Sequence, residues 1–158
     1  MPTSIVLMIR WALAALHLVA LGVGLGAVWA RGRALRAPLD PPGLRRVFYA
    51  DTWWGIAALL WIGTGLVRAF GGYEKGSVYY LHNYLFWTKM ALLAVILVLE
   101  VRPMMSLIRW RTLVARGSVP ETRAARAYAW ISFLQAGLVG LMVLAATGMA
   151  RGYGTPAT

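Results

Sequence analysis

The stretch AYAWISFLQAGLVGLMVLAATGMA, residues 127–150, contains no Asp, Glu, Lys or Arg. A helix that crosses the hydrocarbon core of a bilayer needs roughly 20 predominantly apolar residues, so this stretch is long enough to cross once. Residues 11–30 and 52–67 also lack these charged residues, and residues 76–99 carry only Lys89. The sequence therefore predicts four transmembrane helices, at about 6–29, 48–69, 80–101 and 126–149.

The rest of the 158 residues forms short connections, which indicates one transmembrane domain over residues 1–158. We expect an all-α protein, an integral membrane four-helix bundle. The first apolar run is longer than the apolar core of a signal peptide, which spans ~7–15 residues, so we expect it to stay as a membrane span. The chain has no cysteine, which excludes disulfides and thiolate metal ligands.

The net charge of +11 is concentrated between predicted helices. Eleven of the 16 basic residues lie in the first and third connections, which must share one side of the membrane: Arg31, Arg33, Arg36, Arg45, Arg46, Arg102, Arg109, Arg111, Arg116, Arg123 and Arg126. Cytoplasmic loops carry an excess of Lys and Arg, so we place both connections in the cytoplasm and both termini on the opposite side. Membrane topology accounts for the charge without nucleic acid, and we expect these loops to attract anionic lipid headgroups.

Ionisable residues at membrane depth are rare and usually face the protein interior. Arg10 and His17 are seven residues apart in the first predicted helix, so they share a helical face. His82 and Lys89 have the same spacing in the third predicted helix, which predicts one polar stripe that continues to Glu100. Both helices enter from the outer side. Arg10 is therefore expected at the depth of His82, and His17 at the depth of Lys89, ~10 Å deeper.

Three further charged residues complete the predicted layers. Arg68, at the outer end of the second predicted helix, joins the outer layer. Asp51 and Glu100 fall at the cytoplasmic end, where we expect ordinary ion pairs with nearby arginines, namely Arg31, Arg33, Arg46 and Arg102.

A histidine on a glycine-bearing helix of a four-helix bundle is a common way to hold heme through an axial imidazole. The two layers predict one or two b-type hemes per chain. His17 is the first candidate for axial ligand, and a neutral Lys89 is the candidate for the second axial position or for gating it. His82 is the candidate ligand of a separate outer heme, with Arg10 and Arg68 as partners of its propionates. The candidate aromatic wall residues are Trp11, Trp54, Trp61, Phe86 and Trp87.

Other interpretations of the same residues stay open at this stage. The polar stripe is also typical of a path for protons or a cation, with Lys89 as the gating charge. In a structural membrane subunit, these groups would only pair with one another. Small-residue seams and a large lipid-facing surface predict a homo-oligomer in the bilayer. A redox partner or quinone is a further expected partner, and the sequence leaves open whether the chain is an enzyme.

Three segments carry a resemblance to a known family: LHLVALGVGLGAVWARGRALR (16–36), DTWWGIAALLWIGTGLVRAFGG (51–72) and YLHNYLFWTKMALLAVILVLEVRPM (80–104). Over residues 10–150, the chain resembles a family of small four-helix bacterial inner-membrane proteins whose function is not assigned. That family is distantly similar to the HemJ-type protoporphyrinogen oxidases and to the copper-resistance D membrane domains. The resemblance implies a multi-pass protein of the bacterial inner membrane. With the basic connections in the cytoplasm, both termini are then expected on the periplasmic side.

The HemJ-type proteins bind b-type heme and depend on a first-helix histidine and a third-helix lysine. The positions of this chain that match are His17 in ALHLVA and Lys89 in WTKMALL. The chain departs from the pattern in two places. Its nearest histidine, His82, lies seven residues before the lysine, and the second predicted helix lacks the proline motif of those proteins. The resemblance therefore implies heme binding more directly than it implies oxidase activity.

Overall fold

The computed structural model describes residues 3–72 and 77–154. Its helices are α1 (Thr3–Arg36), α2 (Pro41–Phe70), α3 (Ser77–Leu81), α4 (Tyr84–Ala115) and α5 (Ala125–Ala150), and these described ranges contain no strand. Four of the helices (α1, α2, α4 and α5) are long and apolar enough to cross a membrane. The predicted all-α membrane bundle is therefore confirmed.

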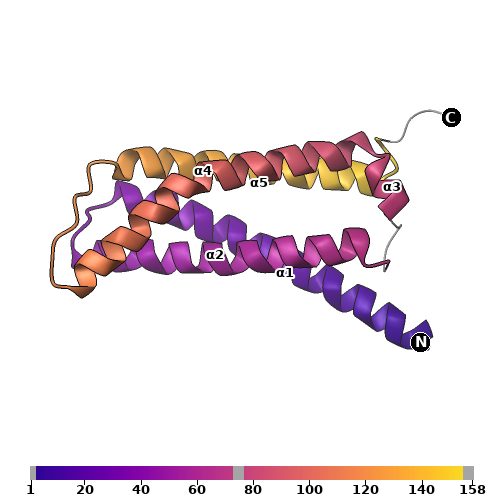
Figure 1. The fold of residues 1–158 in the computed structure, drawn as a ribbon, viewed down its shortest axis with the longest axis horizontal. Helices are drawn as coiled ribbons and strands as arrows, with labels where there is room; N and C mark the ends of the chain where they lie inside the picture. Colours follow the sequence, from indigo (N-terminus) through magenta and orange to yellow (C-terminus); the bar gives the residue numbers. More distant parts are fainter. Residues whose placement is uncertain (1–2, 73–76, 155–158) are drawn as a thin grey trace.

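The long helices run side by side, with α1 packed against both α2 and α5, and with α5 packed against α4 (Figure 1). The start of α1 and the end of α5 lie at one end of the bundle, here called the terminal end. The α1–α2 and α4–α5 connections lie at the other end, here called the loop end, so the two basic connections share one side as predicted. The first turns of α1 extend away from the other helices at the terminal end.

Helix α2 begins earlier than predicted, because its two prolines form its first turn rather than preceding it. Proline is tolerated there, since the first N–H groups of a helix have no partner within the helix. Asp40 caps the helix by accepting a hydrogen bond from Gly43 N at 2.7 Å. The connection between α1 and α2 is correspondingly short.

The third predicted helix, 80–101, is wrong at its start. The chain forms the short helix α3 and then breaks at Asn83, whose backbone is extended at φ −104° and ψ 116°. The Asn83 side chain caps α4 by accepting a hydrogen bond from Leu85 N at 2.9 Å. At its other end α4 continues through Pro103 to Ala115, and Gly117, at φ +73°, follows the cap residue Arg116.

The described residues form three hydrophobic clusters, and two of them contain most of the core. One, near the loop end, includes Leu35, Val47, Leu107, Trp110 and Ala129. The other, here called the central cluster, occupies the middle of the four long helices and includes Val28, Trp54, Ile96, Val139 and Met142. The central cluster divides the polar residues of the membrane-spanning helices into two separate regions.

Candidate functional site

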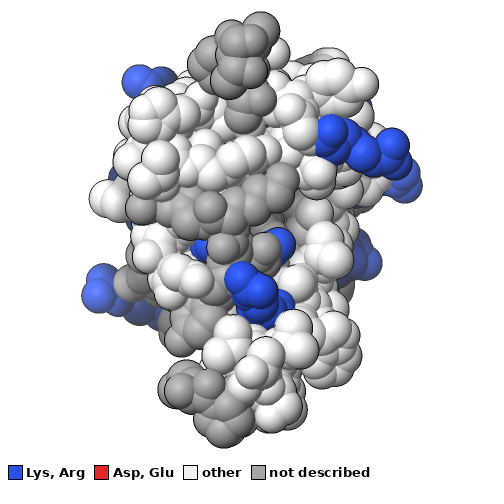
Figure 2. Space-filling view, turned by 90° about the vertical axis from the view of Figure 1, so that its right-hand side faces the viewer, with Lys and Arg blue, Asp and Glu red and all other residues white. Residues whose placement is uncertain are grey.

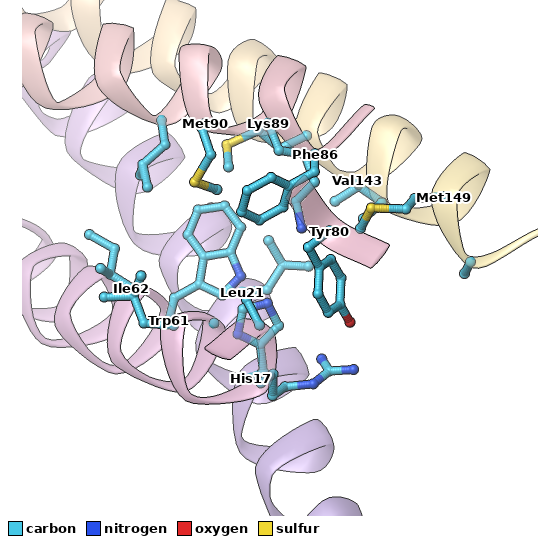
Figure 3. A pocket seen from close by; sticks show the side chains of 18 of the residues that line it. His17, Leu21, Trp61, Ile62, Tyr80, Phe86, Lys89, Met90, Val143 and Met149 are labelled. Atoms are coloured by element: carbon cyan, nitrogen blue, oxygen red, sulfur yellow. The ribbon is translucent and has the colours of Figure 1, made fainter. Parts of the chain in front are cut away.

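The terminal half of the bundle contains a cavity of about 350 Å³ that is lined from all five helices (Figure 3). This volume lies within the ~300–1,000 Å³ range of small-molecule sites. Its charged or titratable lining residues include His17 from α1, Arg68 from α2 and Lys89 from α4. Figure 3 shows His17 and Lys89 on opposite sides of the cavity. The larger apolar and aromatic wall residues include Trp61, Phe86, Met90, Leu93 and Met142.

The imidazole of His17 is held by α2. Its Nδ1 lies 2.9 Å from Thr64 Oγ1, and its ring centre lies 5.8 Å from that of Trp61. A side chain at Gly65 would press on the ring, because a Cβ there would lie 3.2 Å from His17 Cε1. Helix α2 therefore fixes the position of the ring. The other ring nitrogen, Nε2, takes no part in the contact with Thr64.

The polar groups around the cavity are mainly hydrogen-bond donors. Among the described residues, the buried Trp61 Nε1–H has no hydrogen-bond partner. The lining also includes the cationic side chains of Arg68 and Lys89, while no Asp or Glu is among its described residues. Figure 2 looks onto the terminal end and shows Lys or Arg atoms near the middle of this face. A ligand with acceptor or anionic groups suits this lining, since a buried donor without a partner is costly.

The structure brings three of the five predicted site residues to one cavity, namely His17, Arg68 and Lys89. Arg68 therefore lies with the inner pair rather than in a separate outer layer. The predicted outer pair of Arg10 and His82 does not line this cavity.

His82 does not share a helical face with Lys89, so the predicted continuous stripe is wrong. The break at Asn83 separates the two residues, and His82 is exposed, with Nδ1 donating to Val78 O at 2.8 Å. Arg10 is also exposed, because the first part of α1 diverges from the other helices (Figure 1). The geometry gives no support to a separate outer heme between these two residues.

The predicted aromatic wall is right at two of its five positions. Trp61 and Phe86 line the cavity. Trp11 and Trp87 are exposed, at 71% and 55% of their maximal surface. Trp54 lies farther along α2, where its Nε1 donates to Glu100 Oε2 at 3.1 Å.

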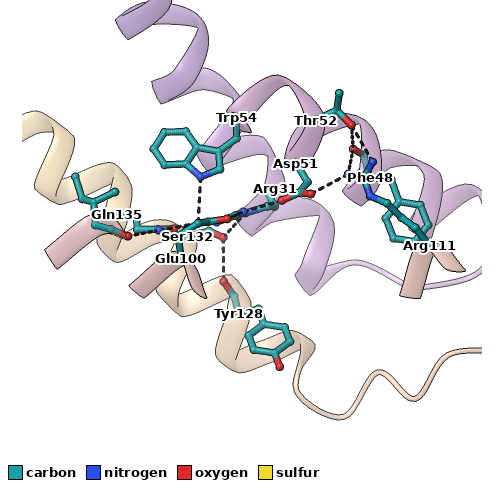
Figure 4. A network of polar contacts seen from close by, with 11 residues as sticks. Arg31, Phe48, Asp51, Thr52, Trp54, Glu100, Arg111, Tyr128, Ser132 and Gln135 are labelled. Atoms are coloured by element: carbon teal, nitrogen blue, oxygen red, sulfur yellow. Dashed lines mark hydrogen bonds and ion pairs between the residues drawn. The ribbon is translucent and has the colours of Figure 1, made fainter. Parts of the chain in front are cut away.

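The second polar region surrounds Arg31, whose side chain is fully buried (Figure 4). Its Nη1 donates to Asp51 Oδ1 at 2.8 Å and to Glu100 Oε1 at 2.6 Å. Its Nη2 donates to Glu100 Oε2 at 2.8 Å and to Gln135 Oε1 at 2.9 Å. Its Nε donates to Ser132 Oγ at 3.0 Å. All five N–H donors of the guanidinium therefore have acceptors.

These residues form a network, here called the Arg31 network, that joins all four long helices. Gln135 Nε2 also donates to Glu100 Oε2 at 2.8 Å. Arg111, near the end of α4, donates to the second oxygen of Asp51 at 2.8 Å. The predicted ion pairs of Asp51 and Glu100 are confirmed for Arg31. Arg111 is a further partner of Asp51 that was not among the predicted arginines.

The Arg31 network has the properties of a structural element. A buried charge is tolerated when it is paired and its remaining hydrogen-bonding groups are satisfied. Within residues 3–72 and 77–154, no group of three His, Asp or Glu side chains is placed to hold a metal ion. The cavity at the terminal end is therefore the candidate site.

A family model described as "Predicted membrane protein (DUF2214)" matches residues 9–154. The chain belongs to this family. No curated protein and no solved structure matches the chain. For this DUF2214 member, the family description agrees with a location in a membrane.

Sequence reasoning missed Thr64 and Gly65, the residues of this DUF2214 chain that contact the imidazole. Both belong to the GTG stretch of α2, residues 63–65, whose small residues indicate by themselves only a close approach of another helix or a ligand. It also missed α3, whose Tyr79 and Tyr80 contribute to the cavity wall. The sequence signal for the break between α3 and α4 was Asn83, because asparagine is favoured at the N-cap of a helix, here α4.

Proposed function

We propose that this chain is a b-type heme-binding protein of the bacterial inner membrane, with a role in electron transfer or porphyrin-related redox chemistry. One observation carries the proposal: the fold brings His17 and Lys89, from two different helices, to opposite sides of one apolar cavity (Figure 3). Imidazole is a common axial ligand of heme iron in helical bundles. Bound heme would supply reversible one-electron chemistry.

The residues around the cavity fit the group. A macrocycle is flat and apolar, and the walls offer the aromatic faces of Trp61 and Phe86. Its propionates are anionic, which suits Arg68, since a guanidinium pairs with carboxylates. The Trp61 Nε1–H, which has no partner within residues 3–72 and 77–154, adds a buried donor that needs an acceptor.

The residues then have separate tasks. His17 would hold the heme iron through Nε2, while α2 holds the other side of the ring. Lys89, when neutral, offers an amine lone pair from the opposite side; when protonated, it offers a cation to a carboxylate. The apolar side chains of the walls lower the polarity around both groups.

The transport alternative has less support. The cavity residues and the Arg31 network occupy different ends of the bundle, and the central cluster of apolar residues lies between them. Among the described residues, the polar groups therefore do not form a continuous path along α4. A proton or cation would have to cross an apolar layer, which is costly without polar partners.

The visible spectrum of the purified protein tests the proposal. Protein from heme-replete cells should show a Soret band that shifts on reduction with dithionite. His17→Ala should lose most of the bound heme, because it removes the axial imidazole. His82→Ala is the matched control and should keep the wild-type heme content, because His82 lies outside the cavity.

A colourless preparation that also fails to bind added hemin would overturn the proposal and favour transport or a structural role. Heme retained unchanged in His17→Ala would overturn the ligand assignment. Folding of each variant is checked by its helical circular dichroism in detergent. This control separates the loss of a ligand from the loss of the bundle.

A further inference from the structure

We infer that Thr64 is a positioning residue that holds His17 in the tautomer with its proton on Nδ1, so that the Nε2 lone pair is left for a ligand in the cavity. The inference deepens the proposed function, since heme iron is the ligand proposed there. The tautomer itself is a property of the unloaded protein and can be tested without heme.

The hydrogen count at Thr64 decides the direction of the bond. Thr64 Oγ1 lies 2.6 Å from Leu60 O and 3.2 Å from Trp61 O. A carbonyl oxygen can only accept, so the single hydroxyl hydrogen is directed to the backbone, as is common for threonine in helices. The hydroxyl oxygen then presents its lone pairs to His17 Nδ1, at 2.9 Å, so Nδ1 acts as the donor, and the Trp61 backbone is a further hydrogen-bond partner of the ring.

Burial makes this arrangement hard to replace by water. Thr64 is only 7% exposed, and the ring of His17 is partly buried between α1 and α2. Gly65 allows the close approach, because a Cβ there would lie 3.2 Å from His17 Cε1. Thr64 supplies the acceptor, and Gly65 supplies the space in which the ring reaches it.

The tautomer determines what the ring can bind. In a neutral imidazole one nitrogen carries the hydrogen and the other carries the available lone pair. A hydrogen bond from the first nitrogen orients the ring and makes the second nitrogen a stronger donor to a metal. Thr64 therefore prepares His17 before any ligand enters.

The direct test is ¹⁵N NMR of the unloaded protein labelled at histidine, in detergent. The chain has two histidines, so His82→Gln leaves His17 as the single signal source. In this background His17 should show a protonated Nδ1 and an unprotonated Nε2. Thr64→Val, which keeps the shape but removes the acceptor, should shift the population toward the Nε2–H tautomer, and Thr64→Ser should restore the original spectrum.

A wild-type ring protonated on Nε2, or a Thr64→Val spectrum identical to that of the wild type, would overturn the inference. Thr64→Ala repeats the measurement should Thr64→Val fail to give folded protein. Heme titration supplies the second readout: Thr64→Val should weaken binding by about 10- to 100-fold, the usual effect of losing a partner of a metal-bound histidine. Thr64→Ser should bind as the wild type does.

The two experiments separate the two proposals. A wild-type protein that shows the Nδ1–H tautomer but binds no heme would overturn the proposed function and support the role of Thr64. A protein that binds heme through His17 but shows the other tautomer would do the reverse. Equal heme affinity of the wild type and Thr64→Val would count against the positioning role.

Discussion

At the loop end of the bundle all five N–H groups of Arg31 have acceptors, whereas at the terminal end the buried indole N–H of Trp61 has none among the described residues. Both groups are buried inside the helical bundle, where a polar group without a partner is costly. The first region is packed and closed by its own side chains. The second region surrounds a cavity of about 350 Å³.

The difference between the two regions indicates two distinct roles for polar residues inside a bundle of membrane helices. In the Arg31 network the polar groups complete one another, so they hold helices together and need no ligand. Around the cavity the described lining carries the cations Arg68 and Lys89 and no Asp or Glu, and the Trp61 N–H has no partner among the described residues, so a ligand with acceptor groups suits it. A substitution should therefore act mainly on folding at the loop end and mainly on ligand binding at the terminal end.

The largest expected effect is at Arg31. Arg31→Met should destabilise the protein by about 3–5 kcal/mol, because it leaves Asp51 and Glu100 partly buried without their shared cation. The measurement is the free energy of unfolding in mixed micelles, followed by circular dichroism. Arg33→Met is the matched control, since Arg33 is exposed on the same helix. Equal stability of the two variants would show that the network does not hold the bundle together.

A smaller loss of stability is expected at Asn83, whose side chain links the start of α4 to the residues after α5 at the terminal end. Asn83 is fully buried, caps α4, and donates from Nδ2 to Tyr153 O at 3.0 Å. Asn83→Ala should cost about 1–2 kcal/mol, because it removes the cap of α4 and the side-chain donor to the Tyr153 carbonyl. Unfolding of this variant and of the adjacent His82→Ala gives the comparison. A loss in His82→Ala as large as in Asn83→Ala would contradict the role of the cap.

Much of the fold was predictable from the sequence, because charge-free runs of membrane-spanning length identify the long helices directly. The basic connections likewise predicted that both loops lie on one side. The break before α4 was not predictable from hydropathy, since residues 80–101 read as one apolar segment. There the local hydrogen bond of the Asn83 side chain overrides the apolar pattern.

Within the candidate site, the sequence predicted only those residue positions that follow from depth along a continuous helix. His17 and Lys89 were matched by depth, and they line one cavity. His82 was placed by seven-residue spacing, which holds only within a continuous helix, and the break at Asn83 removes that condition. The hydroxyl of Thr64 could not be assigned to His17, because contacts between helices depend on rotation and packing that one sequence does not reveal.

The smallest change in stability is expected at Trp61. A substitution there tests most directly whether the two polar regions differ in role. Trp61→Phe loses packing, but it also removes a buried N–H that has no partner among the described residues. The two effects partly offset each other, so the unloaded protein should lose no more than about 1 kcal/mol. Heme affinity should fall severalfold, because the ligand loses a donor. Trp54→Phe is the matched control: it removes a satisfied bond to Glu100, so it should lower stability more than heme affinity. If both variants lost stability equally and kept full heme affinity, the Trp61 N–H would be a packing defect and not part of a binding site.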